Sequence, residues 1–476
     1  MPLILPGNVA TATAATTYSV DNSCMFNGVD TYLSRTTSSA TPTLATKATL
    51  SFWIKTLSPT NQYITYTNGG TSPYFYMQFP DSNGKLVILD YIGGGSSTDI
   101  VGTFVLRDPS AWMHVVYSYD STPSTPSSSS IKIFINGVQT TALTGGSAYA
   151  AQNTATKLTA ASVAHPIGVH ANTSAQFLNA YLAEYMVVDG QALNADSFGE
   201  FDSDSPTIWK PIDISGITVG NQGYYLDFKD SSNLGNDVGG NNFDFTSNNI
   251  DATNQATDTP TNNFCTVNPL DNYFAASTFS EGNCKIVTNS SNYSFNTGTF
   301  GLTAGKWYFE ADCATSAGSD KNVIGISAVP SDATTNYLGE DAYMWSYYGQ
   351  AGNSVTGGTS SSYGDSYTTN DIVGVAIDLD NNKLYFAKNN TWQDSGDPTS
   401  GATGTGALSI TAVASTPTGV YFPAMGDFSS DSSTTWEANF GNPVSANTSD
   451  AADANGYGAF EYAPPSGYLA ICTKNL

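Results

Sequence analysis

The sequence predicts an all-β protein made of two antiparallel β-sandwich (jelly-roll) domains joined by an ordered connector. Three observations support this fold class. Glycine (44), tyrosine (28) and phenylalanine (23) are abundant, which is typical of short strands separated by many turns. The acidic residues are 33 Asp and only 7 Glu, and Asp favours turns over helices. Apolar runs of strand length are also separated by turn signals along the chain.

The first sandwich is expected over residues 20–215. Its apolar runs alternate or form short continuous stretches, as half-buried and central strands do. One run ends in Asn136-Gly137, the strongest short-range signal for a hairpin. A short helical segment is expected at residues 194–201, capped by Asn194 or Asp196. Strands are predicted at residues 50–55, 112–119, 131–138 and 181–188.

The second sandwich is expected over residues 265–476, where the clearest signal is a hairpin that turns at residues 380–382. Residues 216–264 hold too many aromatic side chains for a flexible linker, so they are predicted to be an ordered connector. A strand containing Leu226 and Phe228 is expected to close the first sandwich, and residues 1–19 form an N-terminal arm. Strands of the second sandwich are predicted at residues 305–311, 323–327, 371–379 and 383–390.

Both blocks resemble known families. The first is similar to laminin-G/concanavalin-like domains through Phe26-Asn27-Gly28, Phe52-Trp53-Ile54-Lys55, Trp112-Met113-His114, Ile133-Phe134-Ile135-Asn136-Gly137 and Tyr181-Leu182-Ala183-Glu184-Tyr185. The second resembles SPRY domains through Gly305-Lys306-Trp307-Tyr308-Phe309-Glu310, the hairpin of residues 371–390, Tyr421-Phe422-Pro423-Ala424 and Asn439-Phe440-Gly441. The two in this order resemble virion proteins of marine bacteriophages. That resemblance implies a structural protein displayed on the particle, with glycan or cell-surface binding.

The composition excludes several classes of protein. A formal charge of −25 and a pI of about 4.1 argue against nucleic acid, whose phosphates need a basic surface. No apolar run reaches 18 residues, so membrane insertion is not expected, and residues 1–6 do not resemble a signal peptide. The five cysteines form no CxxC pair, which indicates reduced thiols. We therefore expect assembly in the host cytoplasm and a final location in the virion.

Catalysis is not predicted. A glycoside hydrolase needs two carboxyl groups at a defined separation, and Glu-x-Asp occurs twice, as Glu200/Asp202 and Glu310/Asp312. The first pair ends the expected helical segment, and the second lies on a strand that already has a place in the SPRY pattern. A nucleophilic triad would need a histidine base, and no Gly-x-Ser-x-Gly motif accompanies any histidine. The histidines are His114, His165 and His170.

Two candidate binding sites emerge, each with a structural alternative. Aromatic side chains stack on sugars and also fill protein interfaces, so one aromatic run is a candidate glycan or partner surface; sheet packing is its alternative. No cofactor is predicted except one candidate calcium site in a Gly-rich turn, where Asx-turns are the alternative. The aromatic candidates are Tyr343, Trp345, Tyr347 and Tyr348, and the calcium candidates are Asp227, Asp230 and Asp237.

The leading functional hypothesis is a tail fibre or peripheral virion appendage that adheres to a host-surface glycan. A capsid decoration or head-fibre protein is the main alternative, and a glycan depolymerase is the enzymatic one; an adaptor that binds a peptide through its SPRY domain is a fourth. Other virion proteins and further copies of the chain are the expected partners. The apolar residues Leu3, Ile4 and Leu5 are predicted to dock the arm onto one of them.

Overall fold

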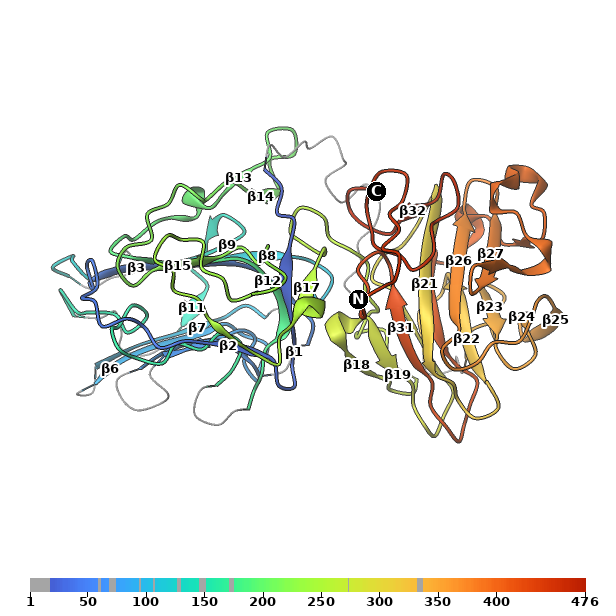
Figure 1. Cartoon of the computed structure of the whole chain (residues 1–476), viewed down its shortest axis with the longest axis horizontal. Helices are drawn as coiled ribbons and strands as arrows, with labels where there is room; N and C mark the ends of the chain where they lie inside the picture. The colour runs from blue at the N-terminus through green and yellow to red at the C-terminus, as the bar shows by residue number, and fades with distance from the viewer. Residues whose placement is uncertain are drawn as a thin grey trace. The chain divides into compact units, whose positions relative to one another are not determined.

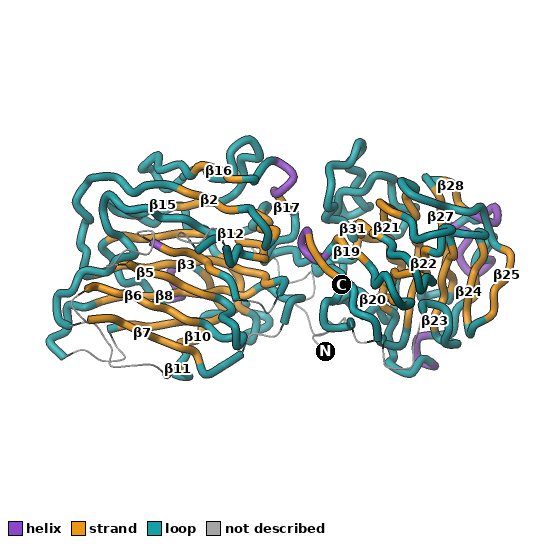
Figure 2. Tube along the Cα trace, turned by 90° about the horizontal axis from the view of Figure 1, so that it is seen from below, coloured by secondary structure: helices purple, strands orange, loops and turns teal. Residues whose placement is uncertain are grey.

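In the computed structural model, the chain divides after Thr261 into two compact units, each a β-sandwich (Figure 1). Strands and loops make up nearly all of both units (Figure 2), as the sequence predicts. The structure describes residues 18–58, 61–67, 74–93, 96–105, 108–125, 130–144, 151–170, 175–272, 274–331 and 337–476.

The larger sheet of the first unit runs in the order β10-β9-β8-β3-β12-β1-β17, and β15 pairs with β12. All of these neighbours are antiparallel. The strands are β1 (Ser23–Asn27), β3 (Lys47–Thr56), β8 (Met113–Asp120), β9 (Ile131–Ile135), β10 (Val138–Gln139), β12 (Asn179–Asp189), β15 (Tyr224–Leu226) and β17 (Gln255–Ala256).

The smaller sheet of the first unit runs β11-β7-β6-β5-β4, and two two-stranded sheets, β13–β14 and β16–β2, accompany the sandwich. Its strands are β4 (Tyr63–Tyr66), β5 (Tyr74–Gln78), β6 (Val87–Gly93), β7 (Ser96–Gly102) and β11 (Leu143–Thr144). The strands of the two-stranded sheets are β2 (Tyr32–Ser34), β13 (Gly199–Phe201), β14 (Trp209–Pro211) and β16 (Thr246–Asn248).

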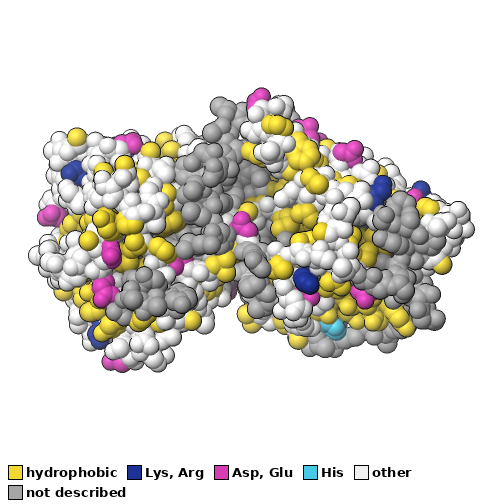
Figure 3. Space-filling view, turned by 180° about the vertical axis from the view of Figure 1, so that it is seen from behind, with side chains coloured by type: hydrophobic (Ala, Val, Ile, Leu, Met, Phe, Trp, Pro, Cys, Tyr) yellow, Lys and Arg dark blue, Asp and Glu magenta, His cyan; other side chains and the backbone are white. Residues whose placement is uncertain are grey.

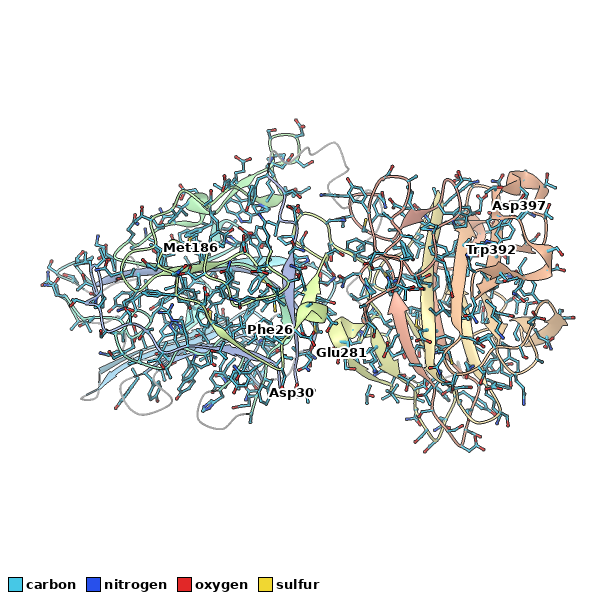
Figure 4. All side chains as sticks on the ribbon, in the orientation of Figure 1. Phe26, Asp30, Met186, Glu281, Trp392 and Asp397 are labelled. Carbon is cyan, nitrogen blue, oxygen red and sulfur yellow. The ribbon has the colours of Figure 1, made fainter. Side chains whose placement is uncertain are left out.

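Alternating side chains build the first core. Leu50, Phe52 and Ile54 point from β3 between the two sheets, where Phe26 also lies. Met186 belongs instead to a second cluster on the opposite face of the large sheet, and Figure 4 labels both Phe26 and Met186. The large sheet is therefore covered on both faces, which explains why its strands read as continuous apolar runs.

Local turn chemistry was predicted with mixed success. Asn136 and Gly137 have φ angles of 47° and 79° and connect β9 to β10, which confirms the hairpin. The prediction of a helical segment at residues 194–201 is wrong, except for a single helical turn. Only η2 (Ala195–Ser197) is helical, Asn194 makes no side-chain cap, and the chain then enters β13.

The stretch predicted to be a connector folds into the first unit. β15 pairs with β12, β16 with β2, and β17 with β1. The Lys55 ammonium lies 2.6 Å from the Asp258 carboxylate, and both side chains are fully buried. Trp112 Nε1 donates a hydrogen bond of 2.7 Å to the same carboxylate. Residues 216–261 therefore complete the sandwich rather than separate it from the next one.

The larger sheet of the second unit runs β18-β19-β31-β21-β26-β27-β28, with β29 on β27 and β32 parallel to β21. The smaller sheet runs β20-β30-β22-β23-β24-β25. The larger sheet has β18 (Thr278–Ser280), β19 (Lys285–Val287), β21 (Lys306–Thr315), β26 (Ile372–Asp378), β27 (Lys383–Lys388), β28 (Thr391–Trp392), β29 (Leu408–Ser409), β31 (Thr435–Asn439) and β32 (Leu469–Ala470). The smaller has β20 (Ser294–Thr297), β22 (Asn322–Ser327), β23 (Met344–Tyr348), β24 (Asn353–Thr356), β25 (Thr359–Ser362) and β30 (Phe422–Asp427).

The core of the second unit lies between these sheets. Trp436 of β31 is fully buried there, and its Nε1 donates a 2.9 Å hydrogen bond to the carbonyl of Gly426 on β30. The first and last segments of the unit are hydrogen-bonded to each other. Cys265 N donates to Ile471 O and Thr473 N donates to Asn263 O, each at 2.9 Å. All five cysteines of the chain are buried thiols, as the sequence suggests.

Helical structure in the described ranges is short. Besides η2 it comprises η3 (Ala252–Asn254), η4 (Glu281–Asn283), η5 (Gln393–Ser395), η6 (Pro398–Thr403) and η7 (Val413–Ser415). Within the part of the chain that the structure describes, no helix is long and apolar enough to span a membrane.

Candidate functional site

The predicted aromatic surface is mostly core. Trp345 and Tyr347 point into the second sandwich with exposed fractions of 6% and 0%, because alternate residues of β23 face inward. These two residues cannot contact a glycan, so their assignment as binding residues is wrong. Tyr343 packs at the edge of the same core. Tyr348 is partly exposed and is the member of the set that borders a surface pocket.

The calcium site predicted at Asp227, Asp230 and Asp237 is not assembled. Asp237 is buried and accepts bonds from the backbone N–H groups of Tyr225, Gly239 and Phe243. Asp227 and Asp230 each bond to the amide two residues later, which is the Asx-turn alternative. Among the described residues, no group of three or more His, Cys, Asp or Glu could hold a metal ion.

The predicted docking residues Leu3, Ile4 and Leu5 lie outside the described residues.

His114 and Ser51 form a contact that resembles a base–nucleophile pair, since Ser51 Oγ lies 2.9 Å from His114 Nε2. However, Trp209 Nε1 donates to His114 Nδ1 at 3.0 Å. A neutral imidazole that accepts at Nδ1 carries its proton on Nε2, so His114 donates to Ser51 and cannot accept its proton. Burial lowers the pKa of His114 to about 3, which keeps the ring neutral.

The first Glu-x-Asp pair is held by a lysine. Lys210 Nζ lies 3.3 Å from Glu200 and 3.2 Å from Asp202. Asp202 also caps a turn through the amides of Asp204 and Ser205. Both carboxylates are therefore engaged in local structure at the β13–β14 hairpin.

The second pair lines a cavity of about 120 Å³ on the outer side of β21, together with Glu437 and Glu461. Both oxygens of Glu310 are occupied. Tyr308 Oη and Asn439 Nδ2 donate to the carboxylate at 3.0 and 3.2 Å, and so do the backbone amides of Glu461 and Tyr462. Glu310 therefore has a structural role: its hydrogen bonds hold residues 461–462, which follow β31, against the large sheet.

Buried carboxyl groups should make stability depend on pH. In the second unit, burial raises the pKa of Glu310 from 4.5 to about 7 and that of Asp427 from 3.8 to about 7. Between about pH 4.5 and 7 the folded state holds these protons and the unfolded state does not, so the stability of the second unit falls as pH rises.

We expect the free energy of unfolding of the second unit, which contains no histidine, to be larger at pH 5 than at pH 8, as denaturant titration would measure. Glu310→Gln should reduce the difference by up to roughly 3 kcal/mol. A stability that rises from pH 5 to pH 8 would contradict this expectation.

A different set of aromatic residues forms the best candidate site. Five tyrosines and one histidine lie together on the outer face of the small sheet in the first unit, opposite the core residues Ile64, Phe75, Met77 and Ile88. We call this set the tyrosine face. Its members are Tyr63, Tyr66, Tyr74, Tyr76, Tyr91 and His170.

Strand register explains how the tyrosine face forms. Tyr74 and Tyr76 alternate with core residues on β5, and Tyr91 of β6 lies opposite Tyr74. On β4, a β-bulge shifts the register between Tyr63 and Thr65. Because of this bulge, Tyr63 and Tyr66 lie on one face with ring centroids 5.6 Å apart, although strict alternation would place them on opposite faces.

The rings form a nearly continuous aromatic surface. Tyr66 stacks on Tyr74 and Tyr76, each at 5.6 Å, and Tyr74 stacks on Tyr91 at 5.2 Å. Tyr74, Tyr76 and Tyr91 are partly exposed. Burial raises the pKa of Tyr76 to about 12, so its hydroxyl stays protonated and can donate. Flat rings with polar tips suit the apolar faces and hydroxyl groups of sugars.

The charge around the tyrosine face is neutral to acidic. The exposed Asp99 of β7 pairs in register with Leu89 beside Tyr76. Basic side chains are sparse on the molecular surface in general, as Figure 3 shows for one side. Sequence reasoning missed this site because its members come from four separate segments; the local signal was the alternation Tyr74-Phe75-Tyr76.

The comparisons with known families agree with this architecture. Residues 27–197 match the model of the concanavalin A-like lectin/glucanases superfamily (Laminin_G_3), and residues 306–427 match the model of the SPRY domain. The chain therefore carries a laminin-G/concanavalin-like domain followed by a SPRY domain, in the order that the sequence predicts.

Individual relatives cover small parts of the chain. Ran-binding protein 9 of Danio rerio and of Homo sapiens are each 33% identical over 87 residues, 18% of this chain. Those residues span 14% and 12% of the two relatives. Among solved structures, the SPRY domain of human HERC1 matches 36% of the chain and 96% of its own length at 14% identity and a TM-score of 0.28. Stonustoxin matches 37% of the chain and 27% of its own length at 16% identity and a TM-score of 0.27.

Proposed function

We propose that this protein is a non-enzymatic adhesion protein that binds glycans through the tyrosine face of its first sandwich. The observation that carries the proposal is the partly exposed rings of Tyr74, Tyr76 and Tyr91, which stack on one another and on the buried ring of Tyr66. The concanavalin-like fold supplies a rigid sheet beneath them. A rigid surface loses little conformational freedom on binding, so the entropic cost of binding is small. A small cost matters most for ligands that bind weakly, such as sugars.

The finer proposal is that the protein is a surface protein of a bacteriophage particle, as a tail fibre or peripheral appendage. It rests on the resemblance of the domain order to virion proteins. Other virion proteins and further copies of the chain are the proposed partners, and a host glycan is the proposed ligand. No cofactor is part of the proposal. A capsid decoration or head-fibre protein remains the alternative, since the same sandwiches could reinforce a shell.

Glycan binding by the full chain tests the first proposal. We expect the double variant Tyr74→Ala/Tyr91→Ala to lose at least about tenfold in affinity for any glycan that the unmodified protein captures on an array, since two stacking rings are removed. Tyr32→Ala is the matched control, because Tyr32 is also partly exposed and lies outside the tyrosine face. Unchanged binding by the double variant would contradict the site, and an absence of glycan binding would favour the decoration alternative.

Two measurements separate the remaining alternatives. The ratio of this chain to the major capsid protein in purified virions distinguishes a decoration protein, which follows the lattice, from a tail appendage present in few copies. Release of reducing sugar from a host polysaccharide, lost in Glu310→Gln or Glu200→Gln, would instead show a depolymerase. The hydrogen bonds that occupy Glu310 give no support to that outcome.

A further inference from the structure

A second aromatic site lies on the smaller sheet of the SPRY domain, on the face away from the core. A pocket of about 160 Å³ opens there. Its floor is apolar, from Val323, Leu338 and Val355, all of them buried. Its walls are aromatic and partly exposed. The lining residues are Val323, Tyr337, Leu338, Tyr348, Val355, Gly358, Ser360 and Phe428.

The aromatic walls stand at steep angles to one another. The Tyr337 ring is inclined by 56° to that of Phe428 at a centroid distance of 4.3 Å. The Tyr348 ring is inclined by 83° to Phe428 at 5.9 Å, and Tyr293 packs behind Phe428 at 4.7 Å. Three aromatic side chains thus line one pocket and can contact a group bound in it, and an aromatic ring attracts a cation through its π-face.

The charge around the pocket has the matching sign. Among the described lining residues none is Lys, Arg or His. The Glu340 carboxylate is close enough to the Tyr337 hydroxyl to raise its pKa by repulsion, after burial as the larger cause. Asp341 follows on the same turn, whose Gly339 carbonyl accepts a 2.9 Å bond from Gly358 N at the pocket edge. A bound cation would therefore gain from the aromatic rings and from the carboxylate of Glu340.

The polar atoms of the pocket indicate which type of ammonium group it can bind. Tyr348 Oη donates to Gln350 at 2.9 Å, and Ser360 Oγ accepts from Asn353 at 2.9 Å. A primary ammonium brings three N–H donors that need acceptors, and leaving them unsatisfied is costly. A quaternary ammonium has no N–H group. We propose that the pocket bounded by Tyr337, Tyr348 and Phe428 binds a quaternary ammonium group.

This proposal is independent of glycan binding by the first sandwich, and its test uses the full chain. The probes are choline and its neutral carbon isostere, 3,3-dimethylbutan-1-ol, followed by ligand-observed NMR of their methyl protons. We expect choline to bind at least about tenfold more tightly than the isostere, because only the cation gains from the rings and from Glu340. Equal affinity, or no binding of choline, would overturn the proposal.

Variants locate the site. Tyr348→Leu should abolish choline binding, whereas Tyr348→Phe, which keeps the ring, should retain it. Glu340→Gln should weaken choline binding and leave the isostere unaffected. Tyr457→Leu is the control, because Tyr457 is partly buried in a different cluster of the same unit. Choline binding that survives Tyr348→Leu in a folded protein would contradict the assignment. Peptides with trimethyl-lysine and free phosphocholine then distinguish a protein source from a headgroup source.

Discussion

Replacing Lys55 by methionine should destabilise the first unit by about 3–5 kcal/mol, the usual cost of leaving one charge of a buried pair without its partner. Lys55 and Asp258 are both fully buried and 2.6 Å apart. Methionine fills a similar volume but brings no charge, so the Asp258 carboxylate would keep only the bond from Trp112 among its bonds described above. Thermal or denaturant unfolding of the full chain measures the effect.

The chain offers a matched control for this prediction. Lys47 lies on β3, as Lys55 does, and its ammonium is 2.9 Å from the carboxylate of Asp120 on β8. The side chains of Lys47 and Asp120 are 32% and 25% exposed. Lys47→Met should therefore cost only about 0–1 kcal/mol. The double variant Lys55→Met/Asp258→Asn should recover part of the loss, because it removes the buried negative charge and keeps an acceptor for Trp112. A loss below about 1 kcal/mol in Lys55→Met would contradict the prediction.

Trp436→Ala should destabilise the second unit by about 3–5 kcal/mol, the range for removing a large aromatic ring from a core. The indole is fully buried and joins the two sheets through its bond to the Gly426 carbonyl. Alanine would leave a cavity and a carbonyl without that donor.

Trp436→Phe separates the two effects. Phenylalanine keeps most of the ring volume and loses the hydrogen bond, so a smaller loss of about 1–3 kcal/mol is expected. Denaturant unfolding, followed by tyrosine fluorescence or circular dichroism, measures both variants. If Trp436→Ala and Trp436→Phe are equally stable, the volume of the indole does not matter and the prediction fails.

The fold was largely predictable because its signals are local. Alternation at residues 50–55 and the Asn136-Gly137 turn each depend on neighbouring residues, and both are confirmed in β3 and the β9–β10 hairpin. The role of residues 216–264 was harder to predict. β16 and β17 are only three and two residues long, too short to carry a recognisable pattern, and only long-range pairing shows that they belong to the first sandwich.

The candidate sites could not be read from the sequence for a related reason. The run Tyr343–Tyr348 is dense in aromatic residues, yet strand alternation sends Trp345 and Tyr347 into the core. The tyrosine face is instead assembled from separate strands, and a β-bulge places Tyr63 and Tyr66 on one face. A sequence pattern reports how many aromatic residues are near one another along the chain, whereas the sheet register decides which of them meet.

Each unit begins and ends at the same place. In the first, β1 pairs with β17, so that Ser23 lies opposite Ala256. In the second, the backbone around Phe264 pairs with that around Cys472. Domains whose ends meet in this way tolerate transfer into new proteins and circular permutation. Either sandwich could therefore be exchanged as a whole between proteins by recombination. A protein could acquire a new sandwich with different loops in one event, without changes in the sequence of the other sandwich.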